Sequence, residues 1–115
     1  MTDINPKREF RHLTRTTRAG IEALAMEIKI GRKRRGWTQE ELAIRAGCSR
    51  LTIIAIERAR PTVALGHVLE AAHMVGLDVF GSASEARNRL ERARETDAIF
   101  PTRIETHTPE IDDDF

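Results

Sequence analysis

The side chains with the clearest chemical capacity are Arg50, Leu51 and Ile54, within the run CSRLTIIAIER. An arginine guanidinium offers two parallel N–H donors, which suit an anion or a planar pair of acceptors. The leucine and the isoleucine add apolar contact surface beside this donor. Glycine-rich phosphate loops, paired catalytic carboxylates and nucleophile–base arrangements are not recognisable. We therefore expect that the protein is not an enzyme and that these side chains form a binding surface. We expect no catalytic residues, no cofactor and no metal site.

Two short helices are predicted to position these side chains. Thr38 and Glu41 have the spacing of a capping box, in which each side chain satisfies a free backbone N–H at a helix start. Gly47 can adopt the left-handed conformation that ends this helix and turns the chain. Ser49 can then cap a second helix. The sequence thus predicts two helices joined by a tight glycine turn.

The inward and outward sides of the second helix follow from its apolar spacing. Ile53 and Ile56 face inward, which leaves Arg50, Leu51 and Ile54 facing outward. Two helices joined by a short turn containing glycine form a helix-turn-helix, whose second helix lies in the DNA major groove. There, arginine pairs with a guanine edge, a contact worth ~1–3 kcal/mol of discrimination, and apolar side chains contact thymine methyl groups.

The whole chain divides into four regions. We expect a basic flexible arm over residues 1–16, a helical DNA-binding domain over 17–81, a charged helix over 82–97 and a disordered acidic tail over 98–115. Within the domain, a first helix from Thr17 ends near Gly36, and a fourth spans residues 64–75. Its apolar stripe consists of Leu65, Val68, Leu69, Ala72 and Val75. The stretch LDVF, residues 77–80, is either a short strand or an apolar extension of the core.

Charge and cysteine content limit the functional classes. Residues 1–60 contain 14 Lys and Arg against 7 Asp and Glu, whereas residues 61–115 contain 5 against 11. A basic half suggests a polyanionic partner, although segregated solvated surfaces are the alternative. The single cysteine, Cys48, excludes an internal disulfide and is expected to be a small buried side chain. With no apolar run long enough for a bilayer, we expect no membrane association and a cytoplasmic location.

The run GWTQEELAIRAGCSRLTIIAIER resembles the Xre, or lambda-repressor-like, helix-turn-helix family. This resemblance implies an all-α bundle of four to five helices, with flexible termini, and a structural ion pair between Arg32 and Glu57. The chain departs from the family at Ala59, where glycine is usual. This departure puts the phosphate contact that the resemblance implies for Arg58 in doubt. The DNA-binding residues expected from the pattern and the resemblance are Gln39, Ser49, Arg50, Leu51, Thr52, Ile54, Ala55, Arg58, Lys33 and Arg34.

A narrower resemblance begins at Arg60. The run RPTVALGHVLEAAHMVGLDVFG, followed by a charged helix and an acidic end, is similar to HipB-type antitoxins, which repress their own operon and neutralise HipA-like Ser/Thr kinase toxins. It implies a homodimer on a pseudo-palindromic operator in double-stranded DNA. The residues implied in the dimer interface are Met74, Leu77, Val79 and Phe80. The alternative is a general Xre-family regulator, of phage or metabolic type, without a toxin partner.

Several segments keep more than one interpretation. The basic arm either enters a minor groove or is merely disordered. The run GRKRR, residues 31–35, is a phosphate-binding, nuclear-localisation or solvated segment. The tail either keeps the protein soluble or binds the toxin partner. The tail residues proposed for that contact are Ile111, Asp112, Asp113, Asp114 and Phe115.

Overall fold

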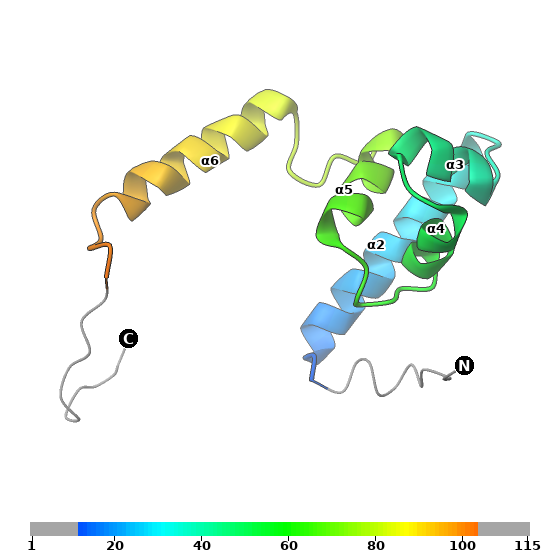
Figure 1. Ribbon diagram of the computed structural model, residues 1–115, viewed down its shortest axis with the longest axis horizontal. Coiled ribbons are helices and arrows are strands. Elements are labelled where there is room, and N and C mark those ends of the chain that lie inside the picture. The colour runs from blue at the N-terminus through cyan, green and yellow to red at the C-terminus, as the bar shows by residue number, and fades with distance from the viewer. Residues whose placement is uncertain (1–11, 104–115) are drawn as a thin grey trace. The chain divides into compact units, whose positions relative to one another are not determined.

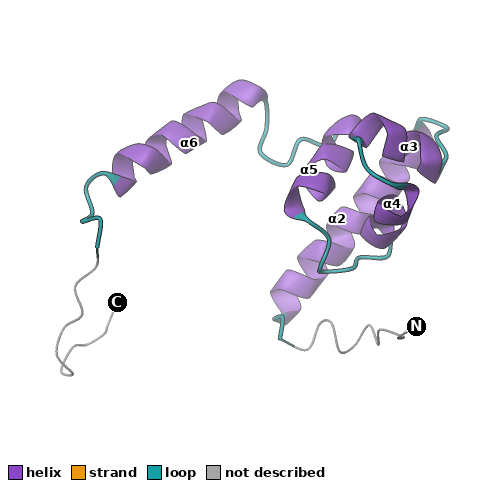
Figure 2. Ribbon diagram, in the orientation of Figure 1, coloured by secondary structure: helices purple, strands orange, loops and turns teal. Residues whose placement is uncertain are grey.

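The computed structural model describes residues 12–103. Five helices lie in this range: α2 (Arg15–Arg34), α3 (Gln39–Ala46), α4 (Arg50–Glu57), α5 (Leu65–Met74) and α6 (Ala83–Asp97) (Figure 1). The described part of the chain holds only helices, turns and irregular segments (Figure 2). The predicted all-α fold is therefore confirmed, whereas residues 77–80 form an irregular segment with a turn rather than the strand considered as one option.

The chain separates into two compact units, one ending at Val79 and the other beginning at Phe80. The first unit contains α2 to α5, and the second contains α6. Helix α2 begins at Arg15, two residues before the predicted start, because the Thr14 hydroxyl accepts a hydrogen bond from the backbone N–H of Thr17 (3.2 Å). Among the described residues, no helix combines the length and apolar character needed to cross a membrane.

Two helices of the described range begin with a capping box, and the one at Thr38 and Glu41 was predicted. At the start of α3, the Glu41 N–H donates to Thr38 Oγ1 (3.0 Å), and the Thr38 N–H donates to Glu41 Oε1 (2.8 Å). At the start of α6, Ser82 and Glu85 form the same two hydrogen bonds, at 3.1 and 2.7 Å. Local sequence is therefore sufficient to define where these two helices begin.

The core lies where α3 packs against α4 and α5, with α2 covering α4. Ile28, Leu42 and Ile53 are its largest fully buried side chains. The other members of the core cluster are Ala43, Ala46, Ile56, Ala71, Ala72 and Val75. The many alanines allow short helices to pack closely. Leu65 was predicted to face inward, but it is 69% exposed in the first turn of α5.

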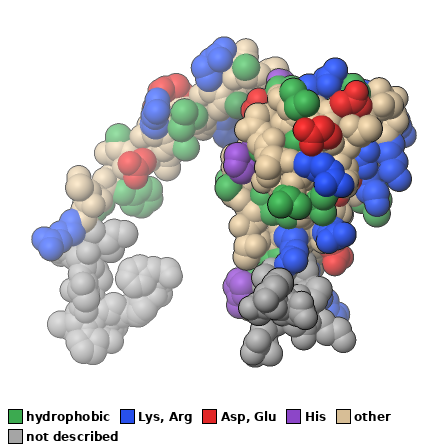
Figure 3. Space-filling view, turned by 45° about the vertical axis from the view of Figure 1, so that its right-hand side comes forward, with side chains coloured by type: hydrophobic (Ala, Val, Ile, Leu, Met, Phe, Trp, Pro, Cys, Tyr) green, Lys and Arg blue, Asp and Glu red, His purple; other side chains and the backbone are tan. Residues whose placement is uncertain are grey.

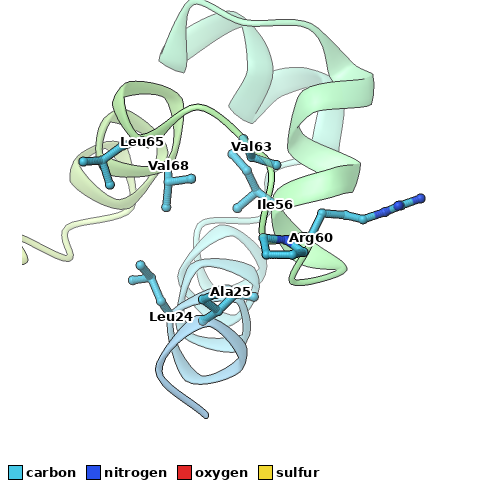
Figure 4. A pocket seen from close by; sticks show the side chains of 9 residues that line it. Leu24, Ala25, Ile56, Arg60, Val63, Leu65 and Val68 are labelled. Atoms are coloured by element: carbon cyan, nitrogen blue, oxygen red, sulfur yellow. The ribbon is translucent and has the colours of Figure 1, made fainter. Parts of the chain in front are cut away.

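An apolar hollow remains beside this core (Figure 4). It has a volume of about 300 Å³ and lies between α2, the α4–α5 connection and α5. Leu24 and Ala25 line it from α2, and Leu65 and Val68 line it from α5 (Figure 4). Arg60 is the one charged residue in its lining, so the hollow lacks the convergent polar groups expected of a catalytic site.

Candidate nucleic-acid interface

Helix α4 presents two chemically different sides. Ile53 and Ile56 are buried, at 0% and 4% exposure. Leu51 is 72% exposed, and Arg50 in the same first turn is also exposed. Ile54 is half-buried. The structure therefore leaves Arg50 and Leu51 fully available to a partner and Ile54 only partly available.

The start of α4 is fixed by hydrogen bonds between its own polar side chains. Ser49 Oγ accepts from the Thr52 N–H (3.1 Å) and shares a second hydrogen bond with Thr52 Oγ1 (2.9 Å). Both side chains are thus engaged with each other in the unbound chain. Thr52 and Ala55 are half-buried, so of the polar candidates here Ser49 and Arg50 are the most exposed.

The turn between α3 and α4 holds the two helices at a fixed angle. Gly47 has φ 71° and ends α3 in the left-handed conformation, while the Cys48 N–H donates to the Ala43 carbonyl (3.0 Å). Cys48 is half-buried against the core, and this burial raises the pKa of its thiol. The small, buried Ala43 lets α3 pack against α4. The predicted conformation of Gly47 is confirmed.

An ion pair ties α2 to the end of α4. Arg32 Nε donates to Glu57 Oε2 (2.6 Å), and an Arg32 terminal nitrogen donates to Glu57 Oε1 (2.9 Å). The other terminal nitrogen donates to the Trp37 carbonyl (2.9 Å). The side chains are 11% and 3% exposed, so the pair lies in a largely dry environment. The hydrogen bond and the charge of Glu57 raise the pKa of Arg32, against the opposite effect of burial.

Gln39 belongs to this same network. Its Nε2 donates to Glu57 Oε1 (3.1 Å), and the side chain is half-buried. The sequence predicts Gln39 as a DNA-binding residue but not this internal contact, because a position at a helix start does not show which side chains of other helices lie nearby. An amide has two N–H donors, so one of them remains for another acceptor.

Basic side chains lie at the end of α2 and on α3. Lys33 and Arg34 are exposed in the last turn of α2. Arg45 and Arg35 lie over the Trp37 ring, with Cζ 4.2 and 5.7 Å from its centroid. Figure 3 shows Lys and Arg side chains spread over this view of the first unit. This stacking was not predicted, because Trp37 lies in the irregular segment between α2 and α3, where helical spacing does not apply.

The turn after α4 explains how Ala59 replaces glycine. Ala59 has φ 60°, the one positive φ of a non-glycine residue in the described range. The Ala59 N–H donates to the Ile56 carbonyl (2.9 Å), and the Arg60 N–H donates to the Ala55 carbonyl (3.0 Å). These are the two hydrogen bonds of a Schellman motif. The turn therefore keeps the left-handed geometry that glycine favours, and Arg58 beside it is exposed.

The four residues expected in a dimer interface are not equivalent. Met74 and Leu77 are half-buried against the core cluster. Val79 and Phe80 are 48% and 46% exposed. Arg89 Cζ lies 5.0 Å from the centroid of the Phe80 ring. Of these four residues, only Val79 and Phe80 are thus exposed.

The remaining candidates lie outside the described residues. The arm expected over residues 1–16 is described only from His12, and the tail only as far as Arg103. The five residues proposed for toxin contact are therefore beyond the described range. They are Ile111, Asp112, Asp113, Asp114 and Phe115.

Comparison with known proteins agrees with this geometry. Residues 23–79 match a helix-turn-helix domain family. The chain is also 32% identical, over 68 residues, to a hypothetical transcription factor from Neisseria meningitidis. That match covers 59% of this chain and 64% of the Neisseria protein. No solved structure matches the chain. Helices α3 and α4, which are joined by the short turn at Gly47, lie within this matched range and have the arrangement of a helix-turn-helix motif.

Proposed function

We propose that this chain is a sequence-specific DNA-binding transcriptional regulator that acts as a homodimer. The observation that carries the proposal is α4, in which buried Ile53 and Ile56 hold exposed Arg50 and Leu51 outward. The major groove, about 12 Å wide, admits one α-helix. Arg50 would read a guanine edge and Leu51 a thymine methyl, with Ile54 supplying a smaller apolar contact.

Backbone phosphates would bind around this reading helix. Lys33, Arg34 and Arg58 are exposed and positively charged. The remaining Gln39 amide hydrogen and the Ser49 hydroxyl could add uncharged phosphate contacts. Thr52 and Ala55, which are half-buried, would lie at the edge of the contact. Since phosphate contacts release counterions, affinity is expected to fall steeply as salt concentration rises.

The homodimer would use Met74, Leu77, Val79 and Phe80. Two copies related by a two-fold axis would place their α4 helices ~34 Å apart, as a pseudo-palindromic operator requires. Such a regulator would work in the cytoplasm, where its operator is found, and would repress its own operon. The half-exposed Val79 and Phe80 support this choice of surface.

The test is fluorescence anisotropy with a duplex from the protein's own promoter and a scrambled duplex. Arg50→Ala should weaken specific binding by about 1–3 kcal/mol while changing binding to the scrambled duplex much less. The matched control is Arg87→Ala, which removes the same charge from an exposed position on α6. Lys33→Ala should instead weaken both duplexes and lower the salt slope by about 1. Unchanged selectivity in Arg50→Ala would remove this residue from the reading surface.

A finer proposal is that the regulator is the antitoxin of a HipBA-like toxin–antitoxin pair and neutralises a Ser/Thr kinase. It is supported by the resemblance of residues 60–81 to HipB-type antitoxins. It is also supported by α6, which has no buried residue and lies in a unit separate from the DNA-binding helices. Because α6 buries none of its own residues in the described part of the chain, its surface remains available to another protein.

The antitoxin proposal is tested with the product of the neighbouring gene. The full chain should retain that protein in a pull-down, and a chain truncated after Phe80 should not. Retention by the truncated chain would exclude α6 and the acidic tail as the binding region. If the full chain fails to bind and the neighbour is not kinase-like, the alternative of a general Xre-family regulator is favoured.

A further inference from the structure

Helix α2 has a second apolar side that the core does not use. Four exposed residues recur along it at spacings of four, three and four, a pattern that we call the outer stripe. They are Ala19, Ala23, Met26 and Ile30. Met26 is 55% exposed and Ile30 is 41% exposed. At 3.6 residues per turn, the outer stripe lies on the side of α2 opposite the buried Ala25 and Ile28.

The outer stripe has polar residues at both ends. The same spacing places Thr16 before Ala19 and Lys33 after Ile30. The apolar surface therefore extends over 11 residue steps, or about 16 Å of helix. A spacing of alternating three and four is the pattern by which two helices pack along a shared seam. Within the described residues, no segment buries this surface.

We propose that the outer stripe is a self-association surface on which α2 helices of two copies pack antiparallel. The spacing reads the same in both directions, so an antiparallel pair aligns all four positions. In this register Ala19 faces Ile30 of the second copy, and Ala23 faces Met26 of the second copy. Each small side chain thus meets a large one, as close packing requires. A parallel pair would set alanine against alanine and leave gaps.

The charges beside the outer stripe favour the same orientation. In a parallel pair, Glu22 would lie beside Glu27 of the second copy, and Lys29 beside Arg34, so both contacts would be repulsive. In the antiparallel pair, Glu22 lies beside Lys29 of the second copy. The two-fold axis repeats this contact, which gives two opposite-charge pairs. Size and charge therefore select one register and one orientation.

The small area of the outer stripe indicates how strongly two copies would associate. Four apolar positions on each helix bury far less than the roughly 1,200–2,000 Å² of a stable interface. The pairing is accordingly weak in free solution and is strengthened where copies are held close together. This use rests on the proposed DNA binding: copies at neighbouring sites would bind cooperatively. The outer stripe includes neither Arg50 and Leu51 nor the Val79–Phe80 surface, so both remain available.

Oxidative cross-linking in the absence of DNA tests the register. In a Cys48→Ala background, Ala23→Cys and Met26→Cys chains are prepared separately and then mixed. The mixture should form disulfide-linked pairs joining position 23 of one copy to position 26 of the other, in clear excess over either variant alone. Cross-linking of Ala23→Cys alone at the level of the mixture would overturn the antiparallel register.

Sedimentation equilibrium over a concentration series that reaches the millimolar range tests the surface itself. Met26→Glu should remove the weakest association step of the unaltered chain. Glu22→Lys and Lys29→Glu should each weaken this step, and the double exchange should restore it. The matched control is Glu70→Lys, an equal charge change at an exposed position of α5. Association unchanged by Met26→Glu and by both charge reversals would overturn the proposal, and no DNA is present to confuse this with failure of DNA binding.

Discussion

Helices α3 and α6 begin with the same local structure but differ in what surrounds them. Each starts with a complete capping box, Thr38 with Glu41 and Ser82 with Glu85. Helix α3 has 8 residues, of which Leu42, Ala43 and Ala46 are buried, whereas α6 has 15 residues and none is buried. A capping box therefore sets where a helix starts, but it does not decide whether the helix joins a core.

The difference follows from composition along each helix. Helix α3 places leucine and alanines on the side that meets α4 and α5. Helix α6 places charged residues around most of its surface, and Leu90 on its apolar side is 49% exposed. An isolated helix of this length is marginal in water. We therefore expect α3 to unfold together with the first unit and α6 to unfold by itself.

The largest expected difference concerns the ion pairs of the two units. Arg32→Ala leaves the Glu57 carboxylate buried without its partner and should lower the free energy of unfolding of the first unit by about 3–5 kcal/mol. Urea unfolding followed by Trp37 fluorescence measures this, since Trp37 is the single tryptophan. Arg94→Ala breaks the exposed Glu91–Arg94 pair of α6 and should shift the same transition negligibly. Equal effects of Arg32→Ala and Arg94→Ala on the free energy of unfolding would contradict a larger contribution from the buried pair.

The two capping boxes should respond differently to the same loss. Thr38→Ala removes the cap of α3 and should destabilise the first unit by about 1 kcal/mol, visible in the Trp37 transition. Ser82→Ala should leave that transition unchanged and instead increase amide hydrogen exchange in the first turns of α6. A shift of the Trp37 transition by Ser82→Ala would show that the two units unfold together.

Two alanines at helix ends allow a further comparison. Ala59 is left-handed with φ 60°, whereas Ala98, the C-cap of α6, is right-handed with φ −65°. Ala59→Gly should stabilise the first unit by about 1 kcal/mol, because glycine adopts positive φ without steric conflict. Ala98→Gly should give no gain in thermal unfolding. A loss of stability in Ala59→Gly would contradict the strained turn.

The smallest expected effect comes from an exposed pair of the first unit. His73 Nδ1 lies 2.6 Å from Asp78 Oδ1, and the hydrogen bond and the charge of Asp78 raise the pKa of His73, with a smaller contribution from Glu70. The raised pKa means that this pair stabilises the fold below the ordinary histidine pKa of about 6.5, and that this contribution is lost as pH rises through the folded-state pKa.

NMR titration of the His73 ring measures this pKa. Asp78→Asn should lower it towards the ordinary value, while the Trp37 unfolding transition at neutral pH should hardly move. An unchanged titration in Asp78→Asn would show that Asp78 is not the cause of the shift. A large change in stability would show that this surface pair contributes as a buried pair does.

Helix starts and inward positions were predictable because they depend on nearby residues. Thr38, Gly47, Ser49 and the paired isoleucines of α4 act through contacts within a few positions. The internal role of Gln39 was not predictable, since its partner Glu57 is 18 residues away. The exposure of Leu65 also escaped prediction, because periodicity identifies an apolar side but not where the neighbouring helices end.

The sequence by itself determined the helices of the described range, their caps and the outward position of Arg50 and Leu51, because short-range hydrogen bonds and apolar spacing act within each segment. The tertiary structure alone decided that Gln39 joins Arg32 and Glu57 and that Arg45 stacks on Trp37. Those outcomes depend on which segments meet in space, and that is settled by packing of the whole chain.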